Sequence, residues 1–94
     1  MMSKIPVDLE KIDPVISDKE ILRVGIIAEL DAINLYEQMA IFAKDVNIKK
    51  ILLDIAKEEK THVGEFQRLL LNRDKEQVKE LEKGKEEVKE EVGE

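Results

Sequence analysis

Three side chains able to bind a metal ion occur at spacings that suit a pair of helices. Glu59 and His62 form a Glu-x-x-His pair, and residues three apart on a helix project side by side. One carboxylate and one imidazole at that spacing can hold the same ion. Glu29 supplies a further carboxylate much earlier in the chain. Carboxylates favour ferric iron and imidazole helps to hold ferrous iron, so this set suits a metal that changes oxidation state.

The same side chains fall on apolar seams, where residues alternate at steps of four and three, the spacing of packed antiparallel helices. The positions of the earlier seam are Leu22, Ile26, Glu29, Ile33, Tyr36 and Ala40. Those of the later seam are Ile48, Leu52, Ile55, Glu59, His62, Phe66 and Leu69. A carboxylate inside such a seam is costly to keep ionised unless a cation neutralises it. The pattern therefore predicts a metal site between the two helices.

A second frame through the later helix follows the same rule. Its positions are Ile51, Ile55, Glu58, His62, Glu65 and Leu69. In this frame Glu58 or Glu65 would be the ligand in place of Glu59, and the pattern alone leaves both frames open. A Glu-x-x-His pair is also common in solvated helices rich in Glu and Lys, so the spacing by itself is a weak signal.

Two further side chains near Glu29 could take part. Tyr36 follows Glu29 by seven residues, two helical turns, and so projects from the same face. Its hydroxyl could hydrogen-bond a ligand carboxylate, although packing is the commoner role of such a tyrosine. Asp31 lies off the seam, where it is either a secondary metal ligand that guides cations or an ordinary solvated acid.

The composition is that of long helices and excludes several classes of function. Of the 94 residues, 40% are charged and 3% are aromatic, which predicts an all-α protein. Cysteine is absent, so disulfides, thiolate metal sites and cysteine nucleophiles are excluded. The net charge of −6 argues against nucleic acid, and charges interrupt every apolar run, which argues against membrane insertion. Without a visible secretory signal, we expect a cytoplasmic protein.

The chain divides into three expected segments. Residues 1–16 contain both prolines and predict an extended arm. Residues 17–72 predict an antiparallel two-helix hairpin. Residues 73–94 predict a charged tail with a short, weak helix, capped by Asp74 and interrupted by Gly84.

Local signals predict the ends of the two hairpin helices. Ser17 opens a capping box and begins the first helix, which runs to about Lys44. Asn47 caps the second helix, which reaches about Leu71. The linker between them is short, as antiparallel neighbours require.

One such hairpin holds half of a di-iron ligand set. Di-iron carboxylate bundles use one Glu from each of two helices and one Glu-x-x-His pair from each of two others. Two hairpins paired face to face would supply Glu29, Glu59 and His62 twice, with a two-fold axis between the metals. We therefore expect a four-helix-bundle-like dimer, and the short chain also favours self-association.

The segments IIAELDAINLYEQMA and ILLDIAKEEKTHVGEFQRLLLN closely resemble the encapsulated ferritin family, including versions fused to an encapsulin shell protein. The resemblance covers about residues 17–72. It implies a ferroxidase that oxidises Fe(II) with dioxygen at a di-iron centre shared by two subunits. It also implies a ring of five dimers, a decamer, that delivers iron for storage inside a cytoplasmic encapsulin nanocompartment.

Carried over residue by residue, the resemblance identifies the metal ligands as Glu29, Glu59 and His62. It thereby favours Glu59 over Glu58. It also implies that Tyr36 is the tyrosine beside the centre.

The chain departs from the family at a few positions. Asp31 keeps the acidic character of a position linked to iron access, whereas Ala28 occupies its partner position. Leu35 lies where an aromatic residue often occurs. The last residues, 91–94, form no recognisable shell-targeting peptide.

Two other functions fit the same residues. In the first, the ligands hold zinc, calcium or manganese as a structural staple across a non-catalytic dimer. Dioxygen consumption on addition of Fe(II) would separate this function from a ferroxidase. In the second, the hairpin is a helical adaptor without metal, whose wide apolar face docks a partner helix. Metal analysis of protein purified without chelator would separate it from the others.

Overall fold

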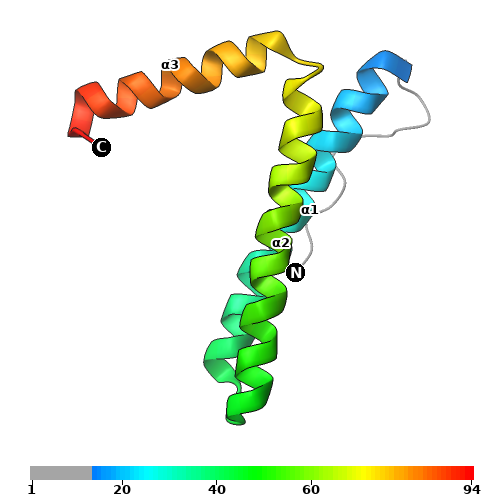
Figure 1. Cartoon of the computed structure of the whole chain (residues 1–94), viewed down its shortest axis with the longest axis vertical. Coiled ribbons are helices and arrows are strands. Elements are labelled where there is room, and N and C mark those ends of the chain that lie inside the picture. Colours follow the sequence, from blue (N-terminus) through cyan, green and yellow to red (C-terminus); the bar gives the residue numbers. More distant parts are fainter. Residues whose placement is uncertain (1–13) are drawn as a thin grey trace.

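Three α-helices make up the described part of the chain (Figure 1). The structure is a computed structural model that describes residues 14–94, with side chains described from Asp18 onward. Helix α1 spans Pro14–Phe42, α2 spans Val46–Leu71 and α3 spans Lys75–Val92. Helices α1 and α2 run antiparallel and side by side (Figure 1). The all-α class and the two-helix hairpin predicted from the sequence are therefore confirmed.

The two hairpin helices end close to where predicted, α1 at Phe42 and α2 at Leu71, but both begin earlier than predicted. Helix α1 begins at Pro14, so the prediction that Ser17 begins it was wrong. Proline suits a first helical turn because its φ is already helical. It lacks a backbone N–H, but an N–H at that position would have no partner within the helix. The cap of α2 is Asp45 and not Asn47, since Asp45 Oδ1 accepts hydrogen bonds from the backbone N–H groups of Asn47 at 2.8 Å and Ile48 at 3.1 Å. Most of the predicted extended arm, residues 1–13, lies outside the described residues.

Helix α3 is continuous and longer than the weak segment predicted. Its 18 residues run through Gly84 without interruption, because closely spaced Lys and Glu side chains offset the low helix propensity of one glycine. Its predicted cap is confirmed: Asp74 Oδ1 accepts a hydrogen bond from the backbone N–H of Gln77 at 3.0 Å. The helix ends at Gly93, whose φ of 76° is the left-handed conformation usual after a helix.

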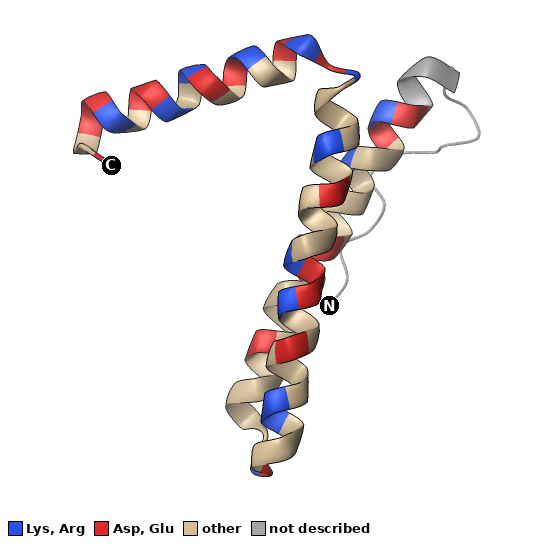
Figure 2. Ribbon diagram, viewed as in Figure 1, with Lys and Arg blue, Asp and Glu red and all other residues tan. Residues whose placement is uncertain are grey.

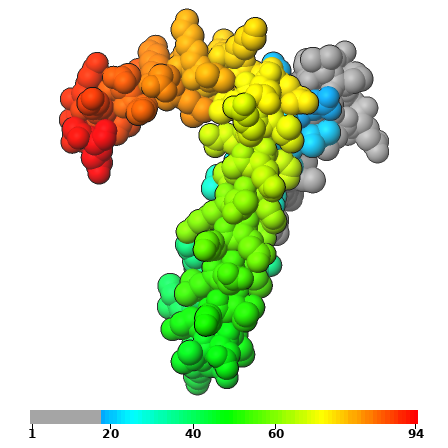
Figure 3. Space-filling view, in the orientation of Figure 1, coloured from blue at the N-terminus to red at the C-terminus, as the bar shows by residue number. Residues whose placement is uncertain are grey.

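The hairpin buries only a thin core. Its buried apolar residues are Leu22, Ile33, Ala40, Ala56 and Leu70. Helix α3 adds no buried residue and projects sideways from the open end of the hairpin (Figure 3). The radius of gyration is 16.6 Å, against about 12 Å for a compact domain of this length. A single copy therefore leaves much apolar surface exposed.

The carboxylate of Asp74 links α3 to the hairpin through Arg23. Nη2 of Arg23, on α1, donates a hydrogen bond to Asp74 Oδ2 at 2.9 Å, while Oδ1 of Asp74 caps α3. The hydrogen bond from the Gln77 N–H lowers the pKa of Asp74 most. Partial burial opposes this, and Arg23 and Lys19 lower the pKa further. Beside this contact the first half of α1, the end of α2 and the start of α3 line an open groove of about 370 Å³.

No helix in the described part of the chain is both long and apolar enough to cross a membrane.

Candidate metal centre

The structure brings Glu29, Glu59 and His62 together at mid-length of the hairpin. One ligand atom of each lies within 4.8 Å of the others. Nδ1 of His62 is 3.4 Å from Glu29 Oε2 and 3.5 Å from Glu59 Oε2. Among the described residues, this is the one group of three or more His, Asp or Glu side chains close enough to share a metal ion.

Helical geometry explains how the group forms. Glu59 and His62 are one turn apart on α2, so their side chains project from the same face. Glu29 faces them from α1, which packs along α2 in the opposite direction. The three side chains thus come from two helices that pack side by side.

The group is partly covered and opens on one side. The side chains of Glu29 and Glu59 are 18% and 19% exposed, whereas His62 is 44% exposed. Oε2 of Glu29 is fully buried and accepts no hydrogen bond from any described residue. A buried polar atom without a partner costs about 1–3 kcal/mol, and more when it is charged. A bound cation would satisfy this oxygen.

The distances and the donor types also fit a metal ion. Two ligands that each lie about 2.1 Å from one ion are roughly 3.0–3.4 Å apart at octahedral to tetrahedral angles. The separations of His62 Nδ1 from the two carboxylates, 3.4 and 3.5 Å, need little adjustment to reach this range. Two carboxylates and one imidazole form a mixed hard and borderline set that suits iron.

The structure favours the frame through Glu59 over its alternative. Glu59 is half-buried and faces Glu29 across the hairpin. Glu58 and Glu65 are exposed, and neither belongs to the ligand group. The register of α2 against α1, which the sequence pattern left open, therefore places Glu59 on the inner face.

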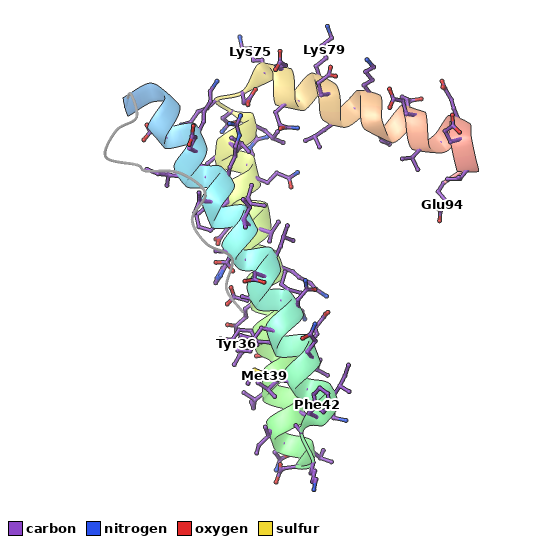
Figure 4. All side chains as sticks on the ribbon, turned by 180° about the vertical axis from the view of Figure 1, so that it is seen from behind. Tyr36, Met39, Phe42, Lys75, Lys79 and Glu94 are labelled. Atoms are coloured by element: carbon purple, nitrogen blue, oxygen red, sulfur yellow. The ribbon has the colours of Figure 1, made fainter. Side chains whose placement is uncertain are left out.

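Tyr36 and Asp31 lie on α1 outside the ligand group. Tyr36 is half-buried, and it lies on the same helix as Met39 and Phe42 in the half nearer the connection to α2 (Figure 4). No hydrogen bond joins its hydroxyl to Glu29 within the described part of the chain. Asp31 is also half-buried and is not part of the three-residue group. The roles expected for both residues remain predictions.

A close helix contact one turn away from the group was not predicted. A Cβ atom built on Gly25 would lie 3.1–3.2 Å from three ring carbons of Phe66. Gly25 precedes Glu29 by four residues, and Phe66 follows His62 by four. The sequence signal was a glycine inside one helix and a phenylalanine inside the other, each one turn from a ligand, but the pairing needs the register of the helices.

The comparisons agree with this geometry. The sequence profile of the rubrerythrin family matches residues 20–93. The ferritin-like-encapsulin shell fusion protein of Pyrococcus furiosus is 70% identical over 74 residues, which are 79% of this chain and 21% of that protein. The chain thus spans about a fifth of the length of this curated relative.

A solved structure covers the whole domain. The crystal structure of the encapsulated ferritin domain from Pyrococcus furiosus matches with a TM-score of 0.85 and 57% sequence identity, over 99% of this chain and 95% of that chain. By this match and by its family profile, the chain belongs to the rubrerythrin family, and within that family to the encapsulated ferritins.

Proposed function

We propose that this protein is a ferroxidase that oxidises Fe(II) to Fe(III) with dioxygen at a di-iron centre shared by two subunits. The observation that carries the proposal is the group of Glu29, Glu59 and His62, whose ligand atoms lie within 4.8 Å of one another. The buried Oε2 of Glu29, which accepts no hydrogen bond from the described residues, supports a cation at this place. Membership of the rubrerythrin family supports a function that involves iron.

The incomplete ligand set supports sharing between subunits. One hairpin offers two carboxylates and one imidazole, which is half of the set used by di-iron carboxylate bundles. A second hairpin related by a two-fold axis would bring its own three ligands and complete the set. The exposed side of His62, with the exposed Ile27 and Leu30 on α1, leaves a surface for such a partner.

In this proposal iron is the substrate. Two Fe(II) ions supply two electrons, which reduce one dioxygen molecule to hydrogen peroxide with the uptake of two protons. Carboxylate oxygens bind Fe(III) more strongly than Fe(II), so the ligand set favours the oxidised product. The imidazole helps to hold the ferrous substrate before oxidation.

We further infer that the dimers form a ring of five and deliver oxidised iron to an encapsulin nanocompartment in the cytoplasm. The relative that is fused to an encapsulin shell supports this location. The thin core and the exposed Ile41, Phe42 and Val46, at 74%, 83% and 76%, support further contacts between subunits. An open ring has no sealed cavity, so storage of mineral would need the shell.

Oxygen uptake and iron stoichiometry test the proposal together. Fe(II) added to chelator-stripped protein should be oxidised rapidly, with the fast phase saturating at about one iron per chain, or two per dimer. Metal binding without oxygen uptake would support a structural metal site, and absence of metal binding would support an adaptor. A monomer that binds two irons tightly would contradict the shared centre.

A further inference from the structure

We propose that Gly25 is a positioning residue of the metal centre. Its missing side chain lets the backbone of α1 lie against the ring of Phe66, and this contact sets the distance between Glu29 and His62. Gly25 and Phe66 offer no ligand atom, so they act through the spacing of the two helices. The inference rests on the proposed metal-binding function of the three-residue group.

The contact has the geometry of a backbone lying on a ring face. A Cβ atom on Gly25 would be 3.1 Å from Cζ of Phe66 and 3.2 Å from both Cδ1 and Cδ2. These three carbons alternate around the ring, so nearly equal distances place the added atom above its centre. Carbon atoms in favourable contact are about 3.5–4.0 Å apart. A methyl group at residue 25 therefore requires the ring or one helix to move.

The contact also lies close enough to Glu29 and His62 for a movement of the ring or of either helix to displace these two side chains. Gly25 is about 6 Å along the axis of α1 from Glu29, and Phe66 is the same distance along α2 from His62, at four residues of 1.5 Å each. Since the helices are antiparallel, Gly25 and Phe66 form the layer directly beside the ligand layer. A widening there of a few tenths of an ångström would change the 3.4 Å separation between Glu29 Oε2 and His62 Nδ1. Metal–ligand distances in proteins stay within about 0.2 Å of their usual values, so both side chains would have to readjust to bind the same ion.

The other two helical glycines provide matched controls. Gly64 lies in α2, two residues after His62, and Gly84 lies in α3. A Cβ atom on either one would meet nothing within 4 Å. Alanine has a higher helix propensity than glycine, so Gly64→Ala and Gly84→Ala should maintain or increase the stability of their helices. At residue 25 the contact with the ring of Phe66 opposes this gain. Only the change at residue 25 should disturb the metal centre.

Binding of Co(II) to the full chain tests the inference, because the visible bands of Co(II) report its coordination geometry. We expect Gly25→Ala to weaken Co(II) binding by about tenfold, the smaller effect typical of outer-shell changes, and to alter the bands. Its helicity without metal should match the wild type, so that weaker binding reports on the metal centre and not on unfolding. Gly64→Ala and Gly84→Ala should match the wild type in affinity and spectrum. Equal weakening in all three variants, or an unchanged Gly25→Ala, would overturn the proposal.

A double variant supplies a second, independent test. Phe66→Leu removes the ring on which α1 rests and should also weaken Co(II) binding. In Gly25→Ala/Phe66→Leu the new methyl group occupies space left by the ring, so binding should be tighter than in Phe66→Leu alone. This comparison holds even if Gly25→Ala does not fold. Losses that simply add in the double variant would overturn the proposal, whereas a wild type that binds neither Co(II) nor Fe(II) would overturn the proposed function itself.

Discussion

The α1–α2 hairpin and α3 both carry apolar residues at helical spacing, but their surroundings differ. The hairpin holds all the buried apolar residues of the described chain, whereas the apolar stripe of α3 is 45–65% exposed. The stripe consists of Val78, Leu81, Val88 and Val92. Charges follow one another along α3, while longer uncharged stretches separate them in the hairpin (Figure 2).

The difference shows what a group of possible metal ligands requires beyond suitable residues. Helix α3 carries many glutamates, yet no described group of ligands forms there, because α3 has no facing helix to bring a second set of side chains close. In the hairpin one glutamate faces a Glu-x-x-His pair across a packed interface. The periodicity of the sequence predicts a helix and its apolar face. Whether that face can hold an ion depends on the side chains that a facing helix brings close to it.

The largest effect should come from removing a ligand from the hairpin. We expect Glu59→Ala to slow ferrous oxidation by about a hundredfold or more, since it removes one carboxylate from each half of the site. Glu58→Ala is the matched control, because it makes the same change at the neighbouring exposed position, and its rate should stay close to wild type. Stopped-flow oxidation of Fe(II) measures both. The reverse ranking would show that the wrong face of α2 had been assigned.

Assembly should respond to metal through the hairpin and not through α3. Four carboxylates that meet across the proposed interface repel one another until cations neutralise them. A metal at a hundred times its dissociation constant stabilises the bound state by about 2.7 kcal/mol, or about a hundredfold in the association equilibrium. Light scattering of dilute protein should therefore show smaller species with chelator and larger species with anaerobic Fe(II).

Two variants test whether the response of assembly to Fe(II) depends on Glu59. Glu59→Ala should reduce the response of assembly to Fe(II), while Glu58→Ala should leave it unchanged. A wild-type mass distribution that ignores metal, at concentrations where monomer and dimer coexist, would contradict a site that straddles the interface.

Changes in side-chain packing should lower the free energy of unfolding more in the hairpin than in α3. This effect should be smaller than those of the ligand and metal experiments. Ala56 in α2 is 1% exposed, so Ala56→Leu should overpack the hairpin and lower the free energy of unfolding by about 1–3 kcal/mol. Val88 in α3 is 50% exposed, and Val88→Ala should change it by no more than about 0.5 kcal/mol. Urea unfolding in chelator at low protein concentration measures both. Equal losses would show that α3 shares a core with the hairpin in the single chain.

The smallest effect should come from titrating the joint between the regions. The Gln77 N–H and Arg23 hold the pKa of Asp74 below its ordinary value of 3.8. A lowered pKa means that the carboxylate contributes its full stabilisation above about pH 4 and loses it as the pH falls through the lowered value. The protection of the Gln77 amide, which is the slowing of its hydrogen exchange relative to that of an unstructured chain at the same pH, should therefore fall below pH 4. In Asp74→Asn this step should be absent.

The structure brings together the three residues that the sequence singled out as ligands, and their role in metal binding stays a prediction. Glu29, Glu59 and His62 could be found because each ligand is polar within an apolar seam. The choice of Glu59 over Glu58 could not follow from that pattern, because it depends on how α2 is rotated against α1. The resemblance to a family made that choice in advance, and the exposure of Glu58 agrees with it.

The remaining differences have local or tertiary causes. Asp and Asn are both common N-cap residues. Helix α2 begins two residues earlier than predicted, so Asp45 occupies the capping position in place of Asn47. The penalty of Gly84, about 1 kcal/mol, is small against the propensity of the whole of α3. The contact of Gly25 with Phe66 joins residues 41 positions apart, so no local pattern could reveal it.

The ligand group described above comes entirely from one hairpin, and in the proposed two-fold pair this has a genetic consequence. Each of the three codons is expressed twice in the same site, so a point mutation at His62 changes the surroundings of both ions at once. The two metal positions therefore cannot diverge in affinity or redox behaviour while the pair is built from identical chains. Divergence would first require duplication and fusion of the hairpin into one four-helix chain, whose halves could then mutate separately.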